Sequence, residues 1–205
     1  MADMQAFRDA VGEWAGGGSG REAGELAERV GVRTAVLVEG PSDLAAVETL
    51  AAGRDRDLAG DGVCVVSMGG AMNVARYADL LGPPGLGLRL TGLCDANEQG
   101  YYERGLDRAG APREGFFVCV ADLEEELIRA LGVARVVEIV RAEGDLPAWQ
   151  IFGRQPAHQG RPAEGQLRRF LGTKKGRKIR YGHLLVRALE PGQEPAPLRD
   201  LLAAV

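Results

Sequence analysis

Four short apolar runs, each followed by a helical segment, constrain the fold of this chain more than any other feature. The runs are residues 34–40, 62–70, 86–98 and 115–120. After the first run, Leu44, Val47 and Ala51 recur at the spacing of one helix face. Strands that alternate with helices in this way predict an α/β fold, with a Rossmann-like parallel sheet of about four strands flanked by helices.

Both ends of the chain are predicted to add helices to this core. Residues 2–15 and 21–30 favour two short helices, separated by a GGGSG hinge. Residues 150–162 are predicted to be a loop that leads into a basic, helical C-terminal extension. We therefore expect an N-terminal helical segment (1–32), an α/β core (33–150), and a linker with a basic C-terminal helical region (151–205).

The composition excludes several classes of protein. No apolar run approaches the roughly 18 residues that span a bilayer, and the N-terminus has no signal-peptide pattern, so a cytoplasmic protein without membrane contact is expected. The three cysteines lie far apart in apolar runs, which favours reduced core thiols over disulfides or a zinc site. With only two histidines, a His-rich metal site is excluded.

Acidic residues gather where the predicted strands end. Glu39 follows the first strand, Asp95 ends the third with Glu98 just beyond it, and Asp122 and Glu124 follow the fourth. In a parallel sheet these ends share one edge, where clustered carboxylates repel one another unless a positive charge lies between them. Mg²⁺ and Mn²⁺ prefer hard oxygen ligands, so the pattern predicts a divalent cation, with two ions as an alternative.

A purely structural interpretation competes with this one. Turns between strands and helices favour acids as N-caps and first-turn residues. For Asp43, Asp122 and Glu125 taken singly, this interpretation is at least as good as a functional one. It is weaker for Glu39 and Asp95, because each closes an apolar strand.

A basic segment lies near the C-terminus of a chain whose formal net charge is −4. All three lysines of the protein fall between Arg161 and Arg187, where Glu164 is the single acid. The segment is interpreted as a clamp for a nucleic-acid backbone, with a solvated helix face as the alternative. Its candidate contact residues are Arg168, Arg169, Lys174, Lys175, Arg177 and Arg180.

Four stretches carry a family resemblance. They are VLVEGPSD (36–43), VVSMGGAMNVARYADLL (65–81), LTGLCDANE (90–98) and FFVCVADLEEEL (116–127). In this order they resemble the motifs of a TOPRIM domain, the topoisomerase–primase fold. More narrowly, Gly69–Gly70 and the D-L-E after the fourth strand are similar to the TOPRIM half of the overcoming-lysogenization-defect (OLD) family of nucleases.

The resemblance implies a role for individual residues. Glu39 matches a metal ligand or general acid/base, Asp43 a ligand for a second metal, and Asp95 the first aspartate of a D-x-D motif. Glu124 matches the glutamate after the fourth strand, and Lys178 resembles the lysine that reaches back to the site. Three glycines would let the backbone approach metal or phosphate, or simply make tight turns: Gly40, Gly69 and Gly70.

Two departures from the family pattern matter. Asn97 stands where the second aspartate of D-x-D is expected; its amide oxygen can ligate a hard cation without adding charge, and Glu98 next to it is an alternative ligand. OLD proteins usually carry an ABC-type ATPase before the TOPRIM half, and this sequence contains no G-x-x-x-x-G-K-[ST] motif. An ATP-driven step would then need a separate ATPase partner.

The resemblance implies a Mg²⁺- or Mn²⁺-dependent nuclease that hydrolyses DNA phosphodiester bonds. Glu39, Asp95 and Lys178 would be its catalytic residues. Two alternatives stay open: a TOPRIM domain that acts on RNA or in another phosphoryl transfer, and a module that binds nucleic acid or a partner without cutting.

Overall fold

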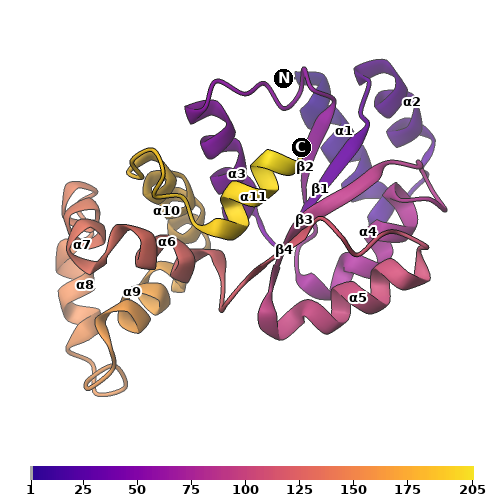
Figure 1. Cartoon of the computed structure of the whole chain (residues 1–205). Coiled ribbons are helices and arrows are strands. Elements are labelled where there is room, and N and C mark those ends of the chain that lie inside the picture. Colours follow the sequence, from indigo (N-terminus) through magenta and orange to yellow (C-terminus); the bar gives the residue numbers. More distant parts are fainter. Residues whose placement is uncertain (1) are drawn as a thin grey trace.

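The structure is a computed structural model that describes residues 2–205, without the side chains of Ala2 and Lys175. Its centre is a four-stranded parallel sheet with the order β2-β1-β3-β4. The strands are β1 (Thr34–Val38), β2 (Val63–Ser67), β3 (Arg89–Asp95) and β4 (Phe116–Cys119). Each lies inside one of the apolar runs that predicted it, and the flanking helices complete the predicted α/β architecture (Figure 1).

Helices follow each strand and extend the chain at both ends. The N-terminal pair is α1 (Ala2–Ala15) and α2 (Arg21–Val30). The strands are followed in turn by α3 (Pro41–Gly53), η1 (Ala71–Asn73) with α4 (Val74–Leu81), η2 (Ala96–Glu98) with α5 (Gln99–Arg108), and α6 (Leu123–Leu131). The C-terminal part contains α7 (Val133–Ala142), α8 (Leu146–Gly153), α9 (Ala163–Gly172), α10 (Lys175–Arg187) and α11 (Ala196–Ala204).

The two faces of the sheet contribute to two separate cores, since successive side chains of a strand point to opposite faces. In β1, Ala35 and Leu37 join the core formed with α1, α2, α4 and α5. Val36 and Val38 join the core formed with α3, α6 and the C-terminal helices. This explains why β1 is buried along its whole length and why its sequence shows no polar alternation.

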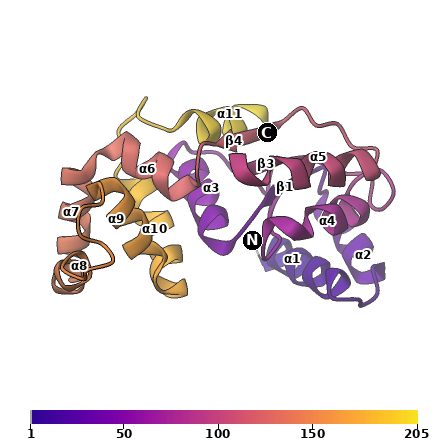
Figure 2. The same ribbon diagram turned by 90° about the horizontal axis from the view of Figure 1, so that it is seen from below.

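The helices after β4 form a lobe beside the sheet, made of α6 to α10 (Figure 1). Helix α10 packs along α3 and so attaches this lobe to the core, while α11 returns to the sheet and packs on β3 and β4 (Figure 2). The prediction of a loop from residue 150 onward was wrong at its start, because α8 runs to Gly153. Its aromatic rings Trp149 and Phe152 pack against Phe170 of α9, which stabilises a helix there.

Candidate metal and phosphate site

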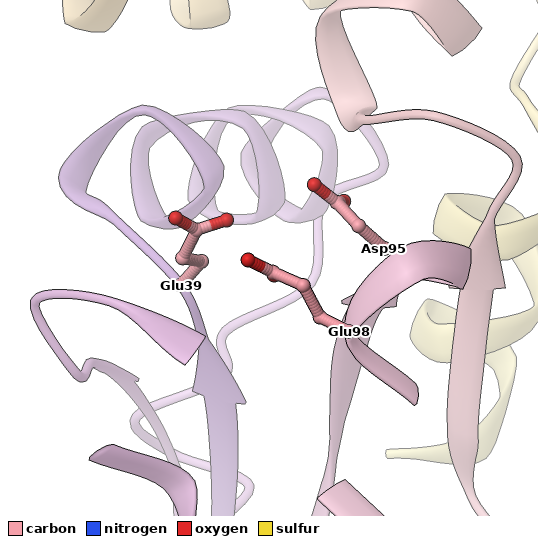
Figure 3. A group of neighbouring side chains, drawn as sticks. All are labelled: Glu39, Asp95 and Glu98. Carbon is pink, nitrogen blue, oxygen red and sulfur yellow. The ribbon is translucent and has the colours of Figure 1, made fainter. Parts of the chain in front are cut away.

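The turn after β1 separates the two acids of the first motif. Gly40 is the N-cap of α3 and has extended backbone angles, with φ −139° and ψ 175°. The Asp43 carboxylate accepts a hydrogen bond from Gly40 N at 2.9 Å and is 8% exposed. Asp43 therefore caps the start of α3, because its side chain accepts from the backbone N–H of the N-cap residue, as the acid of a capping box does. Glu39, one residue before the cap, points its carboxylate toward those of Asp95 and Glu98 at the end of β3 (Figure 3).

Glu39, Asp95 and Glu98 form one acidic group at the carboxyl edge of the sheet. Each offers a carboxylate oxygen, and these oxygens all lie within 4.8 Å of one another (Figure 3). Strands β1 and β3 are parallel neighbours, which brings the first two residues together. The 3₁₀ turn η2 then returns Glu98 to the side of Asp95, because residues three apart in such a turn lie above one another.

The electrostatics of this group favour a cation. Burial raises the pKa of Asp95 to about 7, and the charges of Glu39, Asp122 and Glu98 add to the effect. Burial likewise raises the pKa of Glu98, with further contributions from Glu39 and Asp43. Glu98 Oε2 is buried and has no hydrogen-bond partner among the residues that the structure describes. Three carboxylates with one orphaned buried oxygen fit a hard divalent cation such as Mg²⁺ or Mn²⁺.

Lys178 lies beside a second acidic pair. Its Nζ is 3.2 Å from Glu124 Oε2, and Glu124 is only 4% exposed. Burial raises the pKa of Glu124 to about 7, although Lys178 lowers it. Burial lowers the pKa of Lys178, but the charges of Glu124 and Asp43 outweigh burial and the net shift is upward. Lys178 therefore remains an ammonium group at neutral pH.

Residues from both groups line one cavity. A hollow of about 110 Å³ is lined by Glu39, Asp43 and Lys178, together with the turn residues between the two acids and Ile179. Glu39 of the acidic group and the Lys178 side chain therefore face a common space. Such a space, with a negative wall for the cation and an ammonium for the phosphate, suits phosphoryl chemistry.

A close contact between two helices places Lys178. Gly182 lies one turn further along α10, and a Cβ added there would be 2.6 Å from the carbonyl oxygen of Ser42 in α3. Only glycine allows the two backbones to approach so closely. Gly182 is not among the predicted site residues, although a glycine inside a helical pattern is the usual sign of close packing.

The double glycine after β2 forms a loop that contacts the backbone of Glu39 at the edge of the site. Gly69 and Gly70 have φ values of 72° and 132°, which disfavour other residues. Gly70 N donates a hydrogen bond to the Glu39 carbonyl oxygen at 3.0 Å, so this loop fixes the backbone of Glu39. Gly40 differs, because its extended φ is open to any residue and an added Cβ would meet its nearest neighbour at 3.7 Å.

The predicted clamp residues divide into two sets. Arg168 Nε donates to Asp122 Oδ2 at 2.5 Å, and both Arg177 and Arg180 pair with Asp145 before α8. The Arg177 side chain is only 9% exposed, so its charge links the helices of the lobe. Arg169 and Lys174 are exposed. The side chain of Lys175 lies outside the described part of the structure.

Asn97, the substitution in the D-x-D motif, is exposed in the turn η2. The neighbouring Glu98 is the residue that joins the acidic group. Asp43 and Glu124 lie outside that three-residue group: Asp43 bonds the turn at Gly40, and Glu124 pairs with Lys178. The predicted metal ligands therefore separate into a three-carboxylate group and a pair that shares the lysine charge.

Fold and acidic edge together define a TOPRIM-type domain, a class that comprises nuclease and other phosphoryl-transfer modules. The family model that residues 32–96 match is described as "Overcoming lysogenization defect protein-like, TOPRIM domain". This part of the chain, which holds Glu39, Asp43 and Asp95, is therefore an OLD-like TOPRIM domain.

Solved structures extend the likeness beyond the matched residues. The C-terminal region of the Burkholderia pseudomallei OLD protein superposes with a TM-score of 0.64 and 22% identity, over 84% of this chain and 96% of that one. The C-terminal region of the Xanthomonas campestris pv. campestris OLD protein has 28% identity and a TM-score of 0.63, over 84% and 91%. No curated protein sequence matches this chain. None of the helices within residues 2–205 is both long and apolar enough to cross a membrane.

Proposed function

We propose that this protein is a metal-dependent nuclease that hydrolyses phosphodiester bonds in DNA. The observation that carries the proposal is the convergence of Glu39, Asp95 and Glu98 within 4.8 Å, with Lys178 on the same cavity as Glu39. The OLD-like domain and the similarity to C-terminal regions of OLD proteins support this reaction class.

Glu39, Asp95 and Glu98 would hold the first cation, with Mg²⁺ or Mn²⁺ as the ion. When bound, the ion lowers the pKa of a coordinated water and stabilises charge on phosphate oxygens. Asp43 and Glu124 are proposed as ligands for a second ion. Because Lys178 already neutralises charge beside that pair, a second ion should bind more weakly than the first. The Asn97 amide remains a further proposed ligand.

The protein's own residues prepare the site for phosphate. Glu124 holds the Lys178 ammonium in place, where it can neutralise charge that develops on the phosphoryl oxygens. Gly70 fixes the backbone of Glu39, so the carboxylate points into the site without rearrangement. Preorganised groups of this kind favour the transition state because they need no reorientation during the reaction.

Contact with the nucleic-acid backbone is assigned to the exposed basic residues Arg169 and Lys174, with Lys175, Arg168 and Arg180 as further candidates. Each phosphate contact makes binding more sensitive to salt. An ABC-type ATPase as a partner is a proposal that rests on the resemblance to OLD proteins.

Cleavage of supercoiled plasmid at low salt, with Mg²⁺ or Mn²⁺, tests the proposal. The wild-type protein should nick or linearise the plasmid, EDTA should stop it, and Glu39→Ala should abolish it. Glu138→Ala, which removes an exposed acid of α7, is the matched control and should cleave normally. Absence of cleavage with either ion, under conditions where the protein still binds DNA, would refute the nuclease.

Metal binding separates the roles of the acids and the lysine. Titration with Mn²⁺, followed by electron paramagnetic resonance of the free ion, should show weaker binding for Glu39→Gln and Glu98→Gln. Lys178→Met should bind Mn²⁺ at least as well as the wild type, since it removes a positive charge from the site, yet lose cleavage. Equal Mn²⁺ affinity in wild type and Glu98→Gln would remove Glu98 from the ligand set.

A further inference from the structure

Exposed apolar side chains collect around the acidic edge of the sheet. Within the described residues, the large apolar side chains classed as exposed are Met72 (77%), Tyr101 (43%), Val120 (64%) and Ile151 (64%). The first three follow the carboxyl ends of β2, β3 and β4 respectively, and are called here the apolar rim. Single exposed apolar side chains are ordinary, but three of them at one edge of a sheet, beside a charged site, indicate contact with a partner or ligand.

Each residue of the apolar rim lies within a few residues, along the chain or across a strand pair, of a residue at the acidic edge. Met72 lies two residues after Gly70, whose N–H bonds the Glu39 carbonyl. Tyr101 lies three residues after Glu98, in the first turn of α5. Val120 follows Cys119, the residue paired with Asp95 across β3 and β4. The rim therefore borders the acidic group from three different strand ends.

Helix packing brings two rim residues to the same side of the site. A Cβ added to Gly105 of α5 would lie 2.9 Å from the Ala75 Cα of α4, so these helices touch along their backbones. Helix α5 also contacts η1, which contains Met72. Tyr101 lies one turn before Gly105, so its ring and the Met72 side chain belong to adjoining elements.

Tyr101 presents a ring together with a cation. The Arg104 guanidinium lies 5.1 Å from the centroid of the Tyr101 ring, which is a cation–π contact. The tyrosine remains 43% exposed despite this neighbour. A ring that packs on a base, beside a guanidinium that attracts a phosphate, is the combination found where proteins bind single strands.

A regular duplex offers no base face to this rim. Its bases are stacked on one another, so only their edges are exposed in the grooves between the sugar–phosphate backbones. Unpaired bases expose flat faces that stack on aromatic rings whatever their sequence. We propose that the substrate of this site is single-stranded or locally unpaired nucleic acid, with the bases next to the scissile phosphate packed on Tyr101, Met72 and Val120. This inference rests on the proposed nuclease function and defines its substrate class.

Binding tests the inference independently of cleavage. In a Glu39→Gln background with Mg²⁺, fluorescence anisotropy compares a labelled single strand, the matching duplex, and a duplex with a short unpaired bubble. The single strand and the bubble should bind more tightly than the duplex. Tyr101→Ala should weaken binding of the single strand about tenfold, the effect of losing one stacked base, and Tyr101→Phe should keep it. Met72→Ala should act in the same direction, and Ile151→Ala, an exposed apolar control on α8, should change nothing.

Cleavage by the otherwise wild-type protein then separates failure of the inference from failure of the function. Tyr101→Ala should slow cleavage of the single strand and leave slow duplex cleavage unchanged. Cleavage that is equally fast on duplex and single strand, with no effect of Tyr101→Ala, would overturn the inference while the nuclease stands. Loss of self-association in Met72→Ala, with unchanged binding of every oligonucleotide, would overturn it too and assign the rim to a second copy of the chain. Strand-selective binding that needs Tyr101, without cleavage by any variant, would support the substrate class while the nuclease proposal fails.

Discussion

Replacing Gly182 by alanine should move Lys178, although Gly182 itself does not line the cavity of the candidate site. The added Cβ would lie 2.6 Å from the Ser42 carbonyl oxygen, which belongs to the backbone of α3 and cannot turn aside. To reach ordinary contact near 3.4 Å, α10 must separate from α3 by roughly 0.8 Å. Lys178 lies on the same face of α10, one turn before Gly182, so its ammonium should shift relative to Glu124.

The magnitude follows from two opposing effects. Overpacking a close contact costs about 1–3 kcal/mol, while exchanging glycine for alanine inside a helix gains about 0.5–1 kcal/mol. The net loss of about 0–2.5 kcal/mol lowers Tm by up to roughly 10 °C for a chain of this size. Since a displacement near 1 Å can reduce catalysis by about 100-fold, cleavage should fall at least tenfold at temperatures where the variant is fully folded.

Gly176→Ala is the matched control, because it lies in the first turn of the same helix and an added Cβ meets nothing within 4 Å. It should leave Tm unchanged or raise it, with normal cleavage. Differential scanning calorimetry and plasmid cleavage measure both variants. A Gly182→Ala protein with the stability and activity of the wild type would refute the argument that this contact positions Lys178.

Three further predictions concern stability. Asp122→Ala removes the N-cap that accepts from Glu125 N at 2.8 Å, so denaturant unfolding should show a loss of about 1–2 kcal/mol, smaller in Asp122→Asn. Burial raises the pKa values of Asp95 and Glu124 in the folded state to about 7, from 3.8 and 4.5. Between about pH 4 and 7 the folded protein therefore binds more protons than the unfolded chain. Thermal melts without metal should therefore show stability falling as pH rises through that window, and Mg²⁺ should reduce the fall; a rise would contradict it. Gly105→Ala, with its Cβ 2.9 Å from backbone of α4, should lower Tm, whereas Gly12→Ala, with open space around it, should not.

Local sequence patterns were sufficient for the elements that touch the sheet. The apolar runs predicted all four strands, and the strand ends placed Glu39 and Asp95 at one edge of a parallel sheet. Both predictions depend on properties of short segments, namely apolar runs bounded by turns and helical spacing. The same segments carried the resemblance, which was confirmed by the OLD-like family match over residues 32–96 together with the likeness to C-terminal regions of OLD proteins over 84% of the chain.

Contacts between distant segments decided what each acid and each base does. Asp43, Glu98 and Glu124 all follow strands, yet Glu98 joins Glu39, Asp43 caps α3, and Glu124 meets Lys178 from 54 positions away. The Asp43 cap is local, since its partner Gly40 lies three residues away, whereas the pairing of Glu124 depends on where α10 packs and the grouping of Glu98 with Glu39 depends on the pairing of β1 with β3. Likewise, Arg177 has the same local signature as its exposed neighbours, and its contacts with Asp145 and the Phe170 ring make it a half-buried link of the lobe.

The sequence alone thus determined the sheet, its carboxyl edge, and which residues could reach that edge, because hydrophobic patterning and turn chemistry act within a few residues. The tertiary structure decided the partition of the acids into a three-carboxylate group and a lysine-paired one. It also decided the place of Lys178, through the contact of Gly182 with Ser42. The physical reason is that charge pairing and close packing depend on distances in space, which the packing of α10 on α3 sets and the order of residues does not.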